Sequence, residues 1–169
     1  TAVQNFIKLN NDGSINSTDF LFNLPVNTIH VTSNQDIYVG GKFTTYKNNG
    51  ITTSTVGLVK IDLTGTIDTS FSIGSIGFAG SLGTSNLVKK IHVNDSNKVT
   101  VVGDFISYQS TSANGIIQLN PNGSIDTNFI YGTGFNSVST VSDLAVDEIG
   151  SVYVAGGFTS YNSTAVNRL

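Results

Sequence analysis

One eight-residue stretch occurs three times in the chain, and it constrains the possible folds more than any other feature. In each copy a glycine is followed two positions later by phenylalanine, and three positions after that by tyrosine. The copies cover residues 39–46, 101–108 and 154–161. A repeat of this kind indicates a fold built from similar units that stack against one another.

A second unit recurs between the copies of this stretch, at residues 7–20, 58–71 and 116–129. Each copy begins with apolar and polar residues in alternation, as at Ile7, Lys8 and Leu9, which is the period of a half-buried strand. A tight turn at a glycine follows, and then a shorter strand that ends in phenylalanine. The unit therefore predicts two further strands in every repeat.

Two more strands precede each copy of the glycine stretch, at residues 29–31 and 37–39, at 91–93 and 99–101, and at 144–146 and 152–154. β-Branched residues and glycine dominate, and no window has the period of a helix. We therefore predict an all-β chain in which each repeat supplies four antiparallel strands. One such unit cannot bury both of its faces alone, so the units are expected to stack around an axis as the blades of a β-propeller.

The 169 residues fit one domain, which we take as a single repeat domain over residues 1–169. We expect the third and fourth strands of one blade at 1–20, full blades at about 26–71 and 87–129, and the first two strands with the start of a third at 141–169. This gives an array of about three blades, whereas a propeller typically has four to eight. The chain is therefore expected to be part of a larger propeller; the alternative is a ring completed between chains, such as six blades from two chains. The start at Thr1 and the absence of methionine also indicate a processed chain or a fragment.

Two motifs resemble the delta-60 repeat, a β-propeller repeat family (DUF5122 type) of bacterial and phage surface proteins. The best matches are residues 156–162, Gly-Gly-Phe-Thr-Ser-Tyr-Asn, and residues 122–129, Asn-Gly-Ser-Ile-Asp-Thr-Asn-Phe. The resemblance covers nearly the whole chain, with departures at Asn16, where other copies have aspartate, and at Asp104, where the third copy has Gly157. It implies a propeller within a large secreted, surface or virion protein, and it implies no reaction.

The composition argues against several classes of partner. Charged residues make up only 11% of the chain, against about a quarter in an ordinary domain, and the net charge is −3. The only adjacent basic pair is Lys89-Lys90, so the clustered cations of a nucleic-acid interface are missing. No apolar run approaches the roughly 18 residues of a membrane span, so membrane insertion is not expected. Serine, threonine and asparagine fill the polar positions, which is common in extracellular proteins, and we expect a virion or bacterial cell surface.

Two pairs of equivalent residues could carry chemistry. His30 and His92 occupy the same position in two repeats, but a metal site would require them to converge with carboxylates, and the third copy has Ala145. We interpret them as strand residues on the face opposite the core. Asp68 and Asp126 could be the paired carboxylates of a glycosidase. Because they recur at the same turn, we interpret them as side chains that bond backbone N–H groups.

Other local patterns give no specific site. Residues 10–13, Asn-Asn-Asp-Gly, lack the spaced acidic ligands of a calcium loop. The glycines of the 72–85 connection have no Gly-Lys-Ser/Thr motif and no following helix, so they do not predict a phosphate site. No nucleophile elbow is present. We therefore predict no catalytic residue, no metal and no cofactor.

The variable segments are where binding is expected. They are the connections at 21–27, 72–86 and 130–140, and the loops at 44–55, 106–115 and 159–165, which should emerge on one face of a propeller. Their tyrosines and amides suit a glycan or a protein partner; the alternative is that the tyrosines cap the blade core. The predicted contact residues are Tyr46, Lys47, Asn48, Phe78, Tyr108 and Gln109.

Three functions fit these observations. The first is a non-enzymatic structural and adhesive module of a phage tail fibre, another virion protein or a bacterial cell-surface protein. Its partners would be a protein or glycan on a surface, and other repeats or copies of the chain. The second is a glycan-binding, lectin-like propeller. The third is a secreted hydrolase, which would need an acid–base pair that the sequence does not supply.

Overall fold

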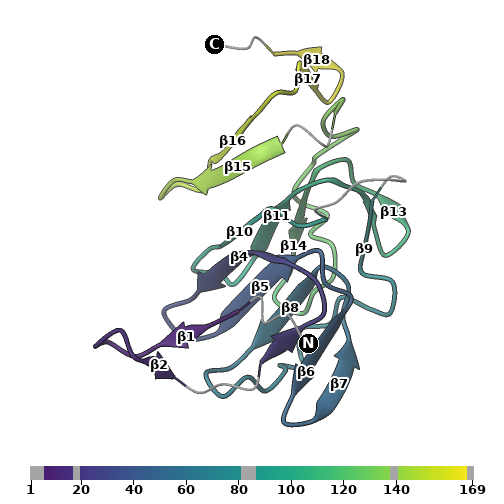
Figure 1. The fold of residues 1–169 in the computed structure, drawn as a ribbon. Helices are drawn as coiled ribbons and strands as arrows, with labels where there is room; N and C mark the ends of the chain where they lie inside the picture. The colour runs from purple at the N-terminus through teal and green to yellow at the C-terminus, as the bar shows by residue number, and fades with distance from the viewer. Residues whose placement is uncertain (1–5, 17–19, 81–86, 138–140, 167–169) are drawn as a thin grey trace.

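The computed structural model describes residues 6–16, 20–80, 87–137 and 141–166, and these residues form only strands, turns and loops (Figure 1). The predicted all-β class is confirmed. Small antiparallel sheets follow one another from the N-terminal to the C-terminal end of the molecule. Within these ranges no helix is present that could cross a membrane.

Two full blades occupy the middle of the chain. In each of them three strands pair in a meander, with the second strand in the centre. The first blade contains β4 (Val26–Val31), β5 (Ile37–Gly41) and β8 (Leu58–Ile61), and the second contains β10 (Lys90–Val93), β11 (Val99–Val102) and β14 (Ile116–Leu119). The alternating β-branched residues of these segments suit a pleated sheet with buried faces.

Partial blades lie at the two ends of the molecule (Figure 1). At one end β1 (Lys8–Leu9) pairs with β2 (Ile15–Asn16), and at the other β15 (Val141–Val146) pairs with β16 (Val152–Gly156). By sequence, β1 and β2 correspond to the third and fourth strands of a blade. In the same way β15 and β16 correspond to the first and second strands.

The predicted fourth strand is much reduced in the full blades. Only isolated bridges, Ile61 to Ile67 and Leu119 to Ile125, stand where a strand was expected. The chain turns away again after the bridge, because Asp68 accepts hydrogen bonds from the backbone and hydroxyl of Ser70 at 2.9 and 2.6 Å. Each blade is therefore a three-stranded sheet with a one-residue fourth position.

The segments at 44–55, 106–115 and 159–165, which were predicted as loops, contain short hairpins. The added strands are β6 (Thr45–Asn48), β7 (Ile51–Ser54), β12 (Phe105–Tyr108), β13 (Thr111–Ser112), β17 (Ser160–Tyr161) and β18 (Thr164–Ala165). The preceding connections supply β3 (Leu21–Phe22), which pairs with β6, and β9 (Phe78–Gly80), which pairs with β12. Phe135 bridges to Tyr161 in the same way. The two kinds of variable segment thus meet in a second small sheet.

The first strands β4, β10 and β15 lie side by side, as the innermost strands of a propeller do. The same hydrogen bond recurs between them. Asn27 donates to the carbonyl of Val88 at 2.7 Å, and Lys89, at the equivalent position one blade on, donates to the carbonyl of Val141 at 2.8 Å. Gly40 allows a close approach at the first of these contacts, since a Cβ there would lie 2.6 Å from side-chain atoms of Val88 and Ile91.

The core consists of three clusters, one for each blade. Each cluster is completed by a residue from the blade before it: Phe6 packs into the first cluster, Leu58 belongs to the second, and Ile116 belongs to the third. The phenylalanines of the recurring stretch sit inside these clusters, and Phe43 and Phe105 are fully buried. These rings therefore fill the cores that hold neighbouring blades together.

Replacement of Phe105 by alanine is expected to lower the free energy of unfolding by about 3–5 kcal/mol, since it removes a fully buried ring and leaves a cavity. Chemical denaturation or a thermal melt measures the loss. The neighbouring Ile106→Ala is the control, because Ile106 is exposed and should change stability far less. Equal melting temperatures for the Phe105 variant and the parent chain would contradict the packing described above.

Candidate functional site

Three of the six predicted contact residues lie in the core. Tyr46 and Tyr108 are buried, and their hydroxyl groups donate hydrogen bonds to the carbonyl oxygens of Gly65 at 2.7 Å and Gly123 at 2.5 Å. Burial raises the pKa of the Tyr108 hydroxyl to about 12. Both tyrosines fasten a hairpin to the turn that follows the third strand of the same blade.

Phe78 is buried beside Tyr108, and its ring centroid lies 4.8 Å from those of Phe105 and Tyr108. The aromatic residues Tyr46, Phe78 and Tyr108 are therefore not available as surface contacts, and the alternative that the tyrosines cap the blade core agrees with the structure. Sequence alone could not separate the two interpretations, because aromatic residues in a variable loop are typical of both.

The other three predicted residues remain near the surface. Lys47 and Gln109 are exposed and Asn48 is partly buried. Gln109 donates to the hydroxyl of Tyr108 at 3.2 Å. Lys47 and Asn48 lie on β6 of the first blade, and Gln109 follows β12 of the second.

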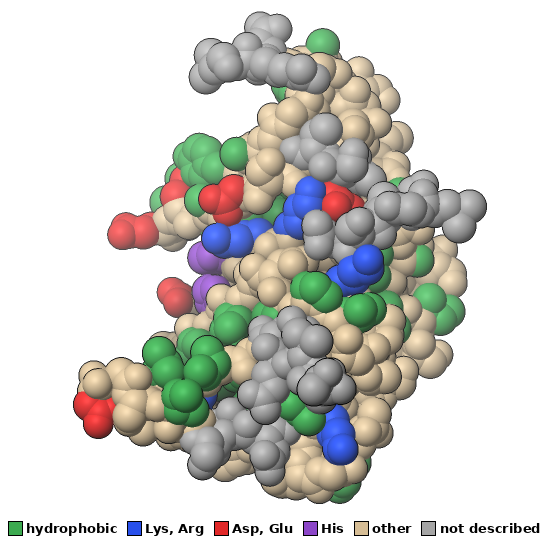
Figure 2. All heavy atoms as spheres, in the orientation of Figure 1, with side chains coloured by type: hydrophobic (Ala, Val, Ile, Leu, Met, Phe, Trp, Pro, Cys, Tyr) green, Lys and Arg blue, Asp and Glu red, His purple; other side chains and the backbone are tan. Residues whose placement is uncertain are grey.

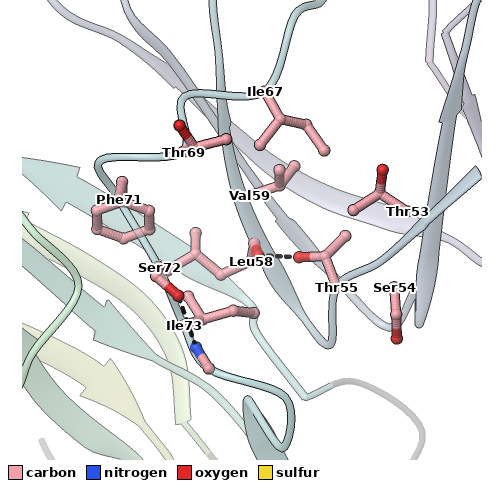
Figure 3. A pocket seen from close by; sticks show the side chains of 11 residues that line it. Thr53, Ser54, Thr55, Leu58, Val59, Ile67, Thr69, Phe71, Ser72 and Ile73 are labelled. Carbon is pink, nitrogen blue, oxygen red and sulfur yellow. Dashed lines mark hydrogen bonds between the residues drawn. The ribbon is translucent and has the colours of Figure 1, made fainter.

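An uncharged groove lies along the β6–β7 hairpin of the first blade. One part, of about 200 Å³, lies between Thr53 and Ser54 on one side and Phe71 and Ile73 on the other, with Leu58 and Val59 between them (Figure 3). A second part, of about 260 Å³, has a lining that includes Asn48, Asn49, Ile51, Thr53 and Thr66. Among the described residues that line the two parts, none has a carboxylate, amine or imidazole side chain. The groove therefore offers hydroxyl, amide and apolar groups to a neutral ligand.

The strand β7 forms the edge of its sheet beside this groove. All four of its residues are exposed, in the order Ile51, Thr52, Thr53 and Ser54. Edge strands of soluble proteins are usually protected by charge, by proline or by a covering segment. An edge without charge is suited to contact with another molecule.

The recurring carboxylates of Asp68 and Asp126 form ion pairs with lysine. In the first blade Lys60 contacts both Asp36 and Asp68, at 2.9 and 2.7 Å. In the second blade, the position of Lys60 is occupied by Gln118, and the position of Asp36 by Lys98, which pairs with Asp126. The aspartate after the bridge thus keeps a lysine partner, although the lysine lies on the third strand in the first blade and just before the second strand in the second blade.

This pairing sets the protonation of the two aspartates. The hydrogen bond from Lys60 lowers the pKa of Asp68 to about 2, with help from Ser70 and against the opposing effect of burial. The hydrogen bond from Lys98 likewise lowers the pKa of Asp126. A glycosidase acid needs a raised pKa in order to donate a proton near neutral pH. The structure therefore supports the interpretation of Asp68 and Asp126 as residues that accept backbone N–H hydrogen bonds in turns, from Ser70 and Asn128, and it adds a lysine partner for each.

His30 and His92 meet on the hollowed edge of the molecule (Figure 2). Their rings lie edge to face, with centroids 5.5 Å apart, and both side chains are partly buried. His30 and His92 belong to different blades, yet the structure brings their rings together. Equivalent residues on adjacent first strands are neighbours, because β4 and β10 lie side by side.

The residues that the structure describes supply no metal site at the histidine pair. Within the ranges that the structure covers, no group of three or more histidine, cysteine, aspartate or glutamate side chains could hold a metal ion. At the suggested calcium loop, Asp12 accepts hydrogen bonds from the backbone and hydroxyl of Ser14, at 2.9 and 2.6 Å, as an ordinary turn residue.

One ion pair was missed by the sequence reasoning. Asp104 is buried and contacts Lys89 at 2.7 Å, and Lys89 also reaches the first strand of the next blade. The residues equivalent to Asp104 are Lys42 and Gly157, so the repeat pattern shows no shared charge at this position. The sequence signal that could have shown this pair is that two opposite charges appear together in one repeat. Asp104 stands where the previous repeat has Lys42, and Lys89 stands where it has Asn27.

The meander sheets, the side-by-side first strands and the shared cores define a β-propeller array. A family model described as a beta-propeller domain of unknown function (DUF5122) matches residues 36–71 and 96–129. These segments run from the second strand to the phenylalanine after the fourth position in the two full blades, so the family's repeat matches both blades, and the resemblance seen in the sequence is confirmed over these residues. No curated protein and no solved structure matches the chain.

Acidification is expected to destabilise the fold through the histidine pair. Burial lowers the pKa of both imidazoles in the folded chain. The charge of His92 lowers the pKa of His30 further. The unfolded chain, with histidine pKa values near about 6.5, then binds protons more readily, so stability is present above that pH and is lost as the pH falls through it.

The test compares thermal melts at neutral pH and at a pH about one unit below 6.5, where the lowered aspartate pKa values contribute little. The double variant His30→Gln, His92→Gln should lose less of its melting temperature between the two conditions than the parent chain does. An equal loss in the two proteins would show that the pair does not cause the acid sensitivity.

Proposed function

We propose that the chain is a non-enzymatic structural and adhesive propeller module of an extracellular protein, on a virion or a bacterial cell surface. The observation that supports the adhesive role is the uncharged β7 edge with its adjoining groove. Four consecutive exposed residues without charge form a contact strip that a partner can cover without burying an unpaired ion.

The placement of the polar side chains supports a non-enzymatic role. The recurring aspartates accept hydrogen bonds in turns and pair with lysine, with pKa values that are lowered. The buried tyrosine hydroxyls donate to backbone carbonyls. These groups are used to hold the blades together, and their protonation states suit that use.

A lectin-like role is the second candidate, and the lining of the groove favours it. Threonine, serine and asparagine side chains beside apolar surface offer hydrogen bonds and packing to a neutral sugar. Such a groove would select an uncharged glycan, since no cation is present in it to pair with a carboxylate or sulfate group.

Binding to whole bacteria and to a glycan array tests both roles. The adhesive role predicts retention of the chain on some cells, and the lectin role predicts that periodate treatment, which destroys sugars, abolishes the retention. Protease treatment of the cells should abolish binding when the partner is a protein. Failure to bind any cell type or glycan would contradict the proposal.

The variant Thr53→Arg places a charge in the middle of the strip and should weaken binding by about tenfold or more, since an unpaired charge buried in a contact costs well over about 1.4 kcal/mol. Ile149→Arg is the matched control, because Ile149 is highly exposed on the β15–β16 turn, away from the groove. Equal binding by the two variants would exclude β7 as the contact surface.

A further inference from the structure

The groove beside β7 has an equivalent in the second blade, and there a side chain closes it. In the first blade the part of about 200 Å³ lies between Ser54 and Ile73 (Figure 3). In the second blade the equivalent residues are Ser112 and Tyr131, and the hydroxyl of Tyr131 donates a hydrogen bond to the carbonyl of Ser112 at 3.2 Å. Tyr131 thus reaches from one wall to the other, whereas the shorter Ile73 leaves the groove open.

The two serines occupy the same position on their strands. Ser54 of β7 lies opposite Thr45 of β6, and Ser112 of β13 lies opposite Ser107 of β12. Thr45 and Ser107 each precede the tyrosine of the recurring stretch. Both β7 and β13 are the edges of their sheets, so the two serines form the same wall in the two blades.

The opposite wall is equivalent as well. Ile73 and Tyr131 each stand two residues after the phenylalanine that ends the recurring unit at 58–71 or 116–129. Each is followed by a glycine with a positive φ, which is 66° at Gly74 and 56° at Gly132. The backbone therefore passes both grooves in a similar way, and the difference between them lies in one side chain.

The carbonyl of Ser54 is turned away from its own sheet. The next residue, Thr55, donates its N–H to the carbonyl of Thr44 at 3.0 Å, and the backbone groups of successive strand residues point to opposite sides. Because β7 is an edge strand, the Ser54 carbonyl faces the side without a strand partner. The equivalent carbonyl in the second blade is the acceptor that Tyr131 uses.

Hydroxyl groups surround this acceptor. Thr53, Ser54 and Thr69 line the groove, and no hydrogen bond joins their hydroxyls to another residue that the structure describes. The second blade also has threonine, serine and threonine at the equivalent positions 111, 112 and 127. A hydroxyl can both donate and accept, so these walls suit a ligand that carries several hydroxyl groups.

The groove of the first blade is also longer. The first hairpin turns at Asn49 and Gly50, and the second turns at Gln109 and Ser110, with positive φ at all four residues. Because two more residue pairs stand before the first turn, β6 and β7 pair over four positions, whereas β12 and β13 pair over two. The added length carries the second part of the groove, of about 260 Å³, so a ligand at Ser54 has further surface beside it.

The side chain that closes the second groove indicates what can fill the first. Tyr131 supplies a flat ring and a hydroxyl donor for the edge carbonyl. A pyranose ring supplies both, with C–H groups on its faces and several hydroxyls around its rim. The phenol ring of a partner protein would bring only one hydroxyl to the three on the walls. The uncharged lining suits a ring without a carboxylate or sulfate group.

We propose that the open groove of the first blade is a subsite for one neutral pyranose ring, which packs against Ile73 and donates a hydroxyl hydrogen to the carbonyl of Ser54. In the second blade Tyr131 occupies the same subsite from within the chain. This inference rests on the lectin-like candidate described above. It makes the residue at position 73, or 131 one blade on, decide whether a blade can bind sugar.

The first experiment follows the amide signals of the isotope-labelled chain by NMR during titration with the methyl glycosides of glucose, galactose, mannose and N-acetylglucosamine. At least one glycoside should shift the signals of residues 52–54 and 69–74 and should saturate at one site per chain. Ile73→Tyr should weaken its binding by at least about tenfold, because the new ring closes the groove as Tyr131 does. Ile73→Leu is the control, since it keeps the groove open and should bind like the parent chain.

A second experiment opens the closed groove. Tyr131→Ile should add a second site for the same glycoside, with new shifts at residues 111–113 and 127–132. Tyr131→Phe removes the hydroxyl but keeps the ring, so it should still bind at one site. This gain of a site decides the proposal even if the Ile73→Tyr variant does not fold.

The outcomes separate this inference from the adhesive role. The absence of binding by all four glycosides, or binding that Ile73→Tyr leaves unchanged, would overturn the subsite. Retention of the chain on cells without any glycoside shift would keep the adhesive role and identify a protein as its partner, against the present proposal. A Tyr131→Ile variant that folds and still binds at one site would overturn the role assigned to Tyr131.

Discussion

The whole structure depends on the burial of one blade by the next. At the start of each third strand, one side chain packs into the core of the following blade. These side chains are Phe6, Leu58 and Ile116. The first strands reinforce this contact through the hydrogen bonds of Asn27 and Lys89 to the neighbouring backbone. No blade is therefore an independent unit of stability, and the energy of the array comes largely from nearest-neighbour interfaces.

The repeat was predictable from the sequence because the same residues are needed in every blade. Glycine, phenylalanine and tyrosine recur where the backbone approaches its neighbour, where the core is filled, and where the hairpin is fastened. The period-2 pattern predicted the paired strands for the same reason: alternate side chains must face a core. The hairpins β6–β7 and β12–β13 were missed, because their second strands, β7 and β13, are exposed and largely polar and have the composition of a loop.

The candidate surfaces were harder to predict, because they depend on which residues are close in space, and the sequence does not show this directly. Tyr46 and Tyr108 stand in variable segments, yet their hydroxyls find carbonyl partners about 20 residues away or less, which a sequence does not show. His30 and His92 are 62 positions apart but touch, since they occupy equivalent positions on adjacent first strands. Reading equivalent residues as spatial neighbours is the rule that would have found the pair.

The exchange of lysine positions between blades has a consequence for how such a chain can diverge. In the first blade Asp68 pairs with Lys60, which lies on the third strand. In the second blade Asp126 pairs with Lys98, which lies before the second strand. A blade thus has two interchangeable sources for the same counter-ion. Lysine at either position can neutralise this aspartate, so the residue at the other position can change while the ion pair is kept.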